Sequence, residues 1–214
     1  MIFVKKLLLF CLGMVFIVIG LSNPMTFIFA LWVFVSLFKA PLVRVFSKIP
    51  GDFAFVVAGL LFGILTELFA IISNLSLPPD ERILLHPDPL IDLIYGFLYY
   101  LFVILTWYFL LRRVCYSKIE IFLLTGIYGV FVEETGQVFL RIFSQPVTGV
   151  LYAIIVVFVY GIFPMLALMV AEKGFSGKRK ESSLMYNFLA AFALFLQYAV
   201  YGNFVYPVLE KYFS

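Results

Sequence analysis

Residues 129–141, with the sequence GVFVEETGQVFLR, place two adjacent glutamates, a glutamine and an arginine inside a long apolar stretch. Carboxylates in apolar surroundings can transfer protons as general acids and bases, or they can hold a cation. A charge at the centre of a membrane helix costs about 2.5–3.5 kcal/mol on insertion scales, so such groups are rarely placed there without a partner or a function. This segment is therefore the first candidate for a polar site.

A second carboxylate lies at the same depth in another apolar stretch. Glu67 follows the start of the stretch 53–74 by 14 residues, and Glu133 follows the start of the stretch 119–143 by 14 residues. In a helix this is roughly 21 Å along the axis, at 1.5 Å per residue. We therefore expect Glu67 and Glu133 to converge. The expected substrate or ion site comprises, in chain order, Glu67, Asp92, Glu133, Glu134, Gln137, Arg141, Gln197 and Asn203.

Arg141, at the end of the segment 129–141, needs an anionic partner. In one continuous helix Glu134 lies about two turns from Arg141, which is too far for a direct ion pair. Asp92 stands near the start of a further apolar stretch, at a matching depth. We therefore expect Arg141 to pair with Asp92 across two neighbouring antiparallel helices, and we expect this pair to be structural.

Small residues precede both glutamates at helical spacing. The pattern Gly-x-x-x-Glu occurs at Gly63–Glu67 and at Gly129–Glu133, and the second series continues at the same interval to Gln137 and Arg141. Residues four apart share one helix face, and small residues on that face let two membrane helices approach closely. Four glycines are expected to serve helix packing, namely Gly59, Gly63, Gly126 and Gly129.

The two patterns also hint at an internal repeat. They start 66 residues apart, and Tyr-Gly pairs at 95–96 and 160–161 lie 65 residues apart. A shift of two spans keeps the direction of crossing, so the repeat would be parallel and not inverted. A true repeat and a bias of composition both remain open.

The composition defines the class of protein. Hydrophobic residues make up 64% of the 214 residues and charged residues 13%, and the mean hydropathy is +1.12. Soluble domains carry about 25% charged residues and 45–50% apolar ones. We therefore expect an all-α polytopic integral membrane protein with a single transmembrane domain over residues 1–214. Seven spans are expected, at about 7–22, 25–45, 53–74, 90–111, 119–143, 147–171 and 185–209.

The basic residues predict the orientation of these spans. If Lys5 and Lys6 lie in the cytoplasm and the chain crosses once per span, twelve of the fifteen lysines and arginines fall in cytoplasmic segments. Cytoplasmic loops carry such an excess. The expected bundle of seven transmembrane helices then has its N-terminus cytoplasmic and its C-terminus outside, in the plasma (inner) membrane and in contact with membrane lipid. The basic sequence KGFSGKRK at 173–180 fits a topology signal, so no nucleic-acid partner is expected.

Residues that bind metals are scarce. The chain has one histidine, and its two cysteines, Cys11 and Cys115, form no CxxC pair, so we expect no metal site and no cofactor. The sequence HPDP at 86–89 instead predicts a helix start, with Asp88 as the N-cap and Pro89 as the first helical residue. Aromatic residues make up 20% of the chain. They leave open a pocket for a lipid or isoprenoid, although lipid-facing phenylalanine with interfacial tyrosine is the preferred explanation.

Three classes of function fit these features. The preferred one is a transporter or channel for a small solute or ion, in which Glu67 and Glu133 carry or sense a proton or cation. The second is a membrane-embedded enzyme that uses paired carboxylates on a lipid-like substrate. The third is a non-catalytic partner, whose polar stripe docks on another membrane protein or on a second copy of the chain. Broken helices are typical of transporters, but here the sequence predicts no broken helix apart from a possible one at Pro164.

Overall fold

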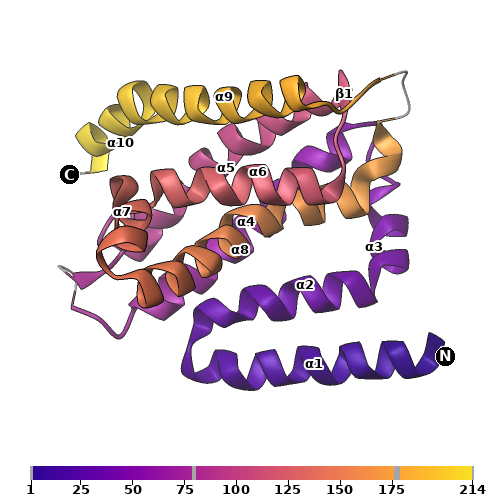
Figure 1. Cartoon of the computed structure of the whole chain (residues 1–214), viewed down its shortest axis with the longest axis horizontal. Coiled ribbons are helices and arrows are strands. Elements are labelled where there is room, and N and C mark those ends of the chain that lie inside the picture. The colour runs from indigo at the N-terminus through magenta and orange to yellow at the C-terminus, as the bar shows by residue number, and fades with distance from the viewer. Residues whose placement is uncertain (1, 79–80, 176–178, 214) are drawn as a thin grey trace.

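The computed structural model describes residues 2–78, 81–175 and 179–213. Its helices run back and forth along one axis (Figure 1). They are α1 Ile2–Ser22, α2 Phe27–Leu37, α3 Lys39–Phe46, α4 Phe53–Asn74, α5 Pro89–Leu111, α6 Lys118–Val132, α7 Gln137–Ser144, α8 Pro146–Ala171, α9 Leu184–Val200 and α10 Tyr206–Phe213. Short helical turns are η1 Pro24–Thr26, η3 Glu133–Gly136, η4 Glu172–Gly174 and the π-helical η5 Tyr201–Val205. Strands β1 Val114–Cys115 and β2 Lys180–Glu181 pair in parallel.

The two ends of the molecule differ in charge. The N-terminus, α3 and β1 lie at one end, and the C-terminus, α7 and α10 lie at the other (Figure 1). We call the first the basic end, because it gathers most of the described lysines and arginines: Lys39, Arg44, Lys48, Arg112, Arg113, Lys118, Lys173, Arg179 and Lys180. The second is called the C-terminal end. Lys178, one of the basic residues counted to predict the orientation, lies outside the described residues.

The helices are those of an all-α, multi-pass membrane protein. Within the described parts of the chain, five helices are long and apolar enough to cross a bilayer, or six when the bent pair α2–α3 counts as one. The bounds of α4 are those of the expected span 53–74. Neither α2 nor α6 alone reaches the length of about 20 residues that a straight span needs.

The expected span 25–45 is not one helix. It divides into η1, α2 and α3, and the chain bends by 81° between Leu37 and Lys39. Lys39 and Arg44 both lie in α3, and charged groups are stable beside water and not in hydrocarbon. The bend therefore turns the charged helix away from the direction of α2, and the expectation of a single straight span was wrong.

The expected span 119–143 is also interrupted, which contradicts the expectation of unbroken helices outside Pro164. Helix α6 ends at Val132, and α7 begins only at Gln137. Between them Glu134 and Thr135 have φ of 48° and 55°, in the left-handed region that non-glycine residues rarely adopt. By contrast α8 continues through Pro164. The turn η5 between α9 and α10 is π-helical and lies within one continuous helix, Leu184–Phe213.

The start of α5 confirms the prediction made for the sequence HPDP. Asp88 is the N-cap, and its side chain accepts hydrogen bonds from the backbone N–H groups of Leu90 at 2.9 Å and Ile91 at 3.2 Å. Pro89 is the first helical residue, a position where its missing N–H group costs nothing.

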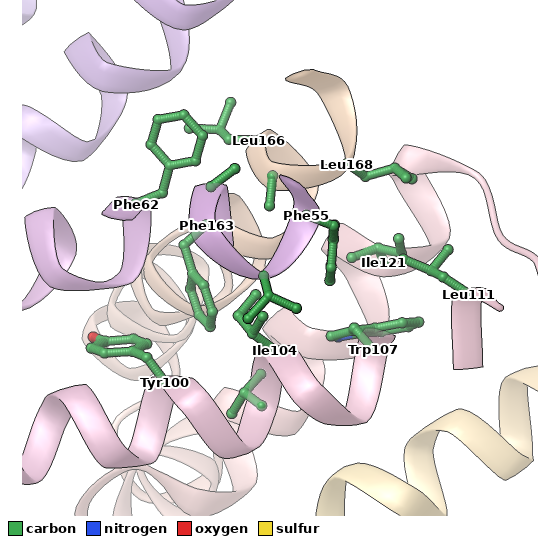
Figure 2. Close-up of a cluster of buried hydrophobic side chains, with 14 of the residues drawn as sticks. Phe55, Phe62, Tyr100, Ile104, Trp107, Leu111, Ile121, Phe163, Leu166 and Leu168 are labelled. Atoms are coloured by element: carbon green, nitrogen blue, oxygen red, sulfur yellow. The ribbon is translucent and has the colours of Figure 1, made fainter. Parts of the chain in front are cut away.

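The half of the bundle near the basic end has a dense apolar core (Figure 2). Trp107, Ile104, Leu111 and Ile121 are fully buried there, and Phe55 of α4 packs among them. Glycines bring the helices together around this core, with Gly59 against Ile104 and Gly126 against the Val157 backbone, leaving no room for a Cβ atom. The buried carboxyls of Glu67 and Asp92 lie in the other half of the bundle.

Candidate functional site

A cavity of about 530 Å³ lies in the half of the bundle that is nearer the C-terminal end. Residues of α4, α5, α8 and α9 form its walls, and η1, η3, η5, residues 83–85 and single residues of α6 and α10 complete the lining. A volume between 300 and 1,000 Å³ is typical of pockets for small organic molecules. The acidic and aromatic lining residues are three glutamates and six tyrosines: Glu67, Glu133, Glu134, Tyr99, Tyr100, Tyr160, Tyr198, Tyr201 and Tyr206.

Glu133 is positioned by a tyrosine of the helix that packs beside it. The Tyr160 hydroxyl of α8 donates a hydrogen bond to Oε2 of Glu133. One turn earlier in α6, Gly129 lies directly against the Tyr160 ring, with no space for a Cβ atom. The glycine therefore lets the ring approach α6 closely enough for its hydroxyl to reach the carboxylate.

Glu67 occupies a matching position between α4 and α5. Its side chain lies beside the Tyr100 side chain and the Asp92 carboxyl, and it is only 9% exposed. Gly63, one turn earlier, packs against the Tyr100 ring, where a Cβ atom would lie 2.7 Å from Cγ. On the far side Gly96 leaves room for the carboxyl, since a Cβ atom there would lie 2.8 Å from Cδ of Glu67.

The structure thus contains the same arrangement twice. In each case a helix carries Gly-x-x-x-Glu, and the helix packed against it supplies a tyrosine that lies on the glycine and reaches the glutamate. Tyr100 is the counterpart of Tyr160, whereas the Tyr-Gly spacing in the sequence pointed to Tyr95. The Tyr95 hydroxyl is instead buried without a hydrogen-bond partner among the described residues.

Glu134 is held apart from the other two glutamates by an ion pair. Arg141 forms a two-pronged salt bridge to it, through Nη1 at 3.0 Å from Oε1 and through Nη2 to Oε2. The Tyr152 hydroxyl donates to the same Oε1 at 3.0 Å, and the Arg141 guanidinium lies 5.6 Å from the Tyr152 ring centre. Glu134 therefore faces the cavity with its charge already balanced.

This ion pair overturns the predicted pairing of Arg141 with Asp92. The prediction assumed a continuous helix, in which Glu134 and Arg141 are too far apart. The kink at η3 interrupts the helix and brings the two side chains together. A bidentate arginine–carboxylate pair also helps to hold the two left-handed residues of η3, which cost about 1–2 kcal/mol each.

Asp92 lies behind Glu67, away from the arginine. It is fully buried, and its Oδ1 accepts a hydrogen bond from the His86 backbone N–H at 3.1 Å. No donor among the described residues bonds to its Oδ2. The carboxyl of Glu67 lies beside it, so the pair is satisfied when one of the two carboxyls carries a proton to share.

The remaining predicted site residues lie outside the cavity lining. Gln137 and Asn203 are exposed, because the break at η3 and the turn η5 shift them off the expected helix faces. Gln197 is buried, and its Nε2 donates to the Tyr128 hydroxyl at 2.8 Å. That hydroxyl is in turn hydrogen-bonded to the Tyr99 hydroxyl at 2.8 Å. Gln197 therefore supports the cavity wall from behind.

The tyrosines are the site residues that sequence reasoning missed. The preferred explanation placed tyrosine at the membrane interface and did not predict that six tyrosines line one cavity. A usable signal was present for Tyr99 and Tyr100, because both follow Asp92 and Gly96 on α5 by one or two helical turns. No equivalent pattern marks Tyr198 or Tyr201.

The donor set does not suit a metal ion. Among the described residues, no group of three or more histidine, cysteine, aspartate or glutamate side chains is placed to hold one. Glu133 is engaged by a phenol and Glu134 by a guanidinium. The arrangement is suited instead to exchanging protons and to binding a cation that needs no shell of metal ligands.

Comparison with models of protein families, with curated proteins and with solved structures finds no match to this chain. The residues and their geometry are therefore the basis for assigning a function.

Proposed function

We propose that this protein transports a small solute or ion across the plasma membrane in a cycle linked to proton or cation binding at Glu67 and Glu133. In this proposal the chain crosses the membrane seven times, with its N-terminus in the cytoplasm and its C-terminus outside. The bent pair α2–α3, the segment α6–α7 and the segment α9–α10 each count as one crossing. The cavity then opens from the outer half of the bilayer.

The observation that carries the proposal is the pair of carboxyl–phenol units that line one cavity. Glu133 receives a hydrogen bond from Tyr160, and Glu67 lies beside Tyr100 and Asp92. Ionisable groups inside a membrane bundle typically mark the pathways of ions and protons. A carboxyl that gives up its proton leaves a negative charge, which a cation entering the cavity can compensate. Exchange of a proton for a cation at these glutamates is the elementary step of the cycle.

The interrupted helix α6–α7 supports transport over simple packing. The break at η3 contributes Glu133–Thr135 to the cavity, and the π-helical turn η5 within the continuous helix Leu184–Phe213 adds Tyr201 and Gly202. Irregular backbone is tolerated at membrane depth only where it is buried in protein or lines a cavity. Transporters commonly form their binding sites from such discontinuous helices.

The basic end is closed in this conformation, so the cycle needs a second one that opens it. Tyr116, after β1, is buried, and its hydroxyl donates to the Tyr186 backbone oxygen at 2.6 Å. Burial raises the pKa of Tyr116 to about 12, so this hydrogen bond persists at neutral pH. Glu120 accepts a hydrogen bond from Ser182 nearby, and Lys118 pairs with Glu172.

The test is proton flux in liposomes that contain the purified protein and a pH-sensitive dye. Wild-type protein should collapse an imposed pH gradient in a solute-dependent manner, because proton movement is coupled to the solute. Glu67→Gln and Glu133→Gln should each lower the rate at least tenfold. Glu181→Gln is the matched control, since Glu181 is exposed at the basic end, far from the cavity. Unchanged flux in both glutamine variants would contradict the proposal.

A membrane-embedded enzyme is the second candidate, and one observation favours it. The cavity lies in the half of the bundle toward the C-terminal end, while the core near the basic end is filled by apolar side chains, as expected for a site that converts a substrate without passing it through. An enzyme would turn over its substrate in detergent without any gradient, whereas a transporter would not. An outward-facing docking stripe is the least supported role, because Glu67 and Glu133 line an interior cavity.

A further inference from the structure

The size of the cavity limits what it can hold. At about 530 Å³, it is within the range of pockets for small organic molecules and far larger than a single dehydrated metal cation. A bare inorganic ion would be surrounded by water in it and would be recognised poorly. The occupant is therefore expected to be an organic molecule with several non-hydrogen atoms.

The charges of the lining set the sign of that molecule. Glu67 and Glu133 line the cavity without a basic partner, and Glu134 is already neutralised by Arg141. No lysine, arginine or histidine belongs to the described lining. An anionic ligand would meet like charge and no compensating donor in a low-dielectric region, so the lining selects against anions.

The tyrosines present their rings to the ligand and use their hydroxyls elsewhere. The Tyr160 hydroxyl donates to Glu133, the Tyr99 hydroxyl bonds to Tyr128, and the Tyr201 hydroxyl donates to the Tyr95 backbone oxygen at 2.9 Å. What remains available at these positions is aromatic surface. Aromatic faces attract cations, and clusters of them recognise quaternary ammonium groups.

We infer that the cavity binds an organic cation, either a quaternary ammonium or a protonated amine, between the tyrosine rings and the carboxylates of Glu67 and Glu133. This inference names the solute class of the proposed transport site and rests on that proposal. The positive group replaces the proton that a glutamate releases, and the rings replace its water shell. The apolar part of the ligand occupies the rest of the cavity.

Titration calorimetry on the purified full-length protein in detergent tests this inference. The probes are choline and 3,3-dimethylbutan-1-ol, a neutral analogue in which carbon replaces the nitrogen. Choline should bind, and the neutral analogue should bind at least tenfold more weakly, because only choline carries the charge. Equal binding of the two probes, or no binding of choline, would overturn the inference.

Two matched variants separate the ring from the hydroxyl. Tyr198→Phe keeps the aromatic surface and should bind choline within twofold of wild type, whereas Tyr198→Leu should bind at least fivefold more weakly. Equal affinities in the phenylalanine and leucine variants would contradict recognition by rings. Thermal unfolding of each variant checks that it is folded.

The liposome assay, run in parallel with choline as the solute, separates the failure of this inference from that of the proposed function. Proton flux that depends on another solute, without choline binding, would overturn the organic-cation class and leave transport standing. Choline binding to the liposome-embedded protein without any flux would overturn transport and leave the binding site standing.

Discussion

At the scale of single residues, the site depends on phenols that satisfy carboxylates. Tyr160 donates to Glu133 and Tyr152 donates to Glu134. A buried charged group that loses its hydrogen-bond partner pays its full desolvation penalty. These tyrosines therefore have a structural as well as a functional effect, and the two can be separated by removing only the hydroxyl.

Tyr160→Phe removes the donor to Glu133 and keeps the ring that packs on Gly129. We expect a loss of about 1–3 kcal/mol of stability, the cost of an unsatisfied buried acceptor. For chains of 150–250 residues, each kcal/mol lowers the unfolding midpoint by about 2–4 °C. Thermal unfolding in detergent measures it, with Tyr198→Phe as the control that leaves the Glu133 pair intact. A Tyr160→Phe midpoint equal to that of the control would contradict the role of the hydrogen bond.

Arg141→Met leaves Glu134 facing the cavity without its counter-charge. The Arg141 side chain is 41% exposed, so the expected loss of about 1–3 kcal/mol lies between the values for exposed and buried ion pairs. The double variant Arg141→Met with Glu134→Gln should recover most of that loss, because no charge is then left unpaired. If the double variant were no more stable than the single one, the ion pair would not be what holds η3.

At the scale of elements, the break between α6 and α7 determines which residues reach the cavity. Its position could not be read from the sequence, because Glu134 and Thr135 adopt positive φ values that neither residue type favours. Only Gly136, with φ of 90°, is a residue that signals such a conformation. The predicted positions of Gln137 and of the Arg141 partner failed for this reason, since both assumed that the helical spacing continued through residue 133.

The close packing of α6 on α8 predicts a strong effect of a single methyl group. Gly129→Ala places a Cβ atom against the Tyr160 ring, and overpacking of this kind typically costs about 1–3 kcal/mol. Gly202→Ala is the matched control, because open space surrounds Gly202, and its effect should stay within about 0.5 kcal/mol. Both are measured by thermal unfolding in detergent. Equal midpoints for the two variants would show that α6 and α8 are farther apart than the structure places them.

At the scale of the whole molecule, composition and hydrophobic stretches were enough to predict an all-α membrane protein. The bounds of α4, α5 and α8 could be predicted to within one residue, because long apolar runs end at polar loops. The cavity could not be predicted, since it depends on which helices neighbour each other in space. Gly-x-x-x-Glu spacing identified two faces that turn inward, but nothing in the sequence shows that Tyr100 and Tyr160 meet them.

The proposed orientation can be tested with two conservative cysteine variants in a background where Cys11 and Cys115 are replaced by serine. Ser76, just after α4, and Ser47, just after α3, are both exposed and lie toward opposite ends of the bundle. In intact cells, a membrane-impermeant maleimide should label Ser76→Cys, and it should label Ser47→Cys only after permeabilisation. The reverse pattern, or labelling of both in intact cells, would contradict the proposed topology.

The most direct measurement of the central claim is carbodiimide labelling of the purified protein, with modified residues located by mass spectrometry. Such reagents modify protonated carboxyls in apolar surroundings. If Glu67 and Glu133 exchange a proton for a cation in one cavity, their labelling should increase as the pH falls and decrease at least threefold when choline is added. Glu181 serves as the exposed reference. Labelling of Glu67 and Glu133 that stays at the Glu181 level, or that does not respond to pH and choline, would contradict the claim.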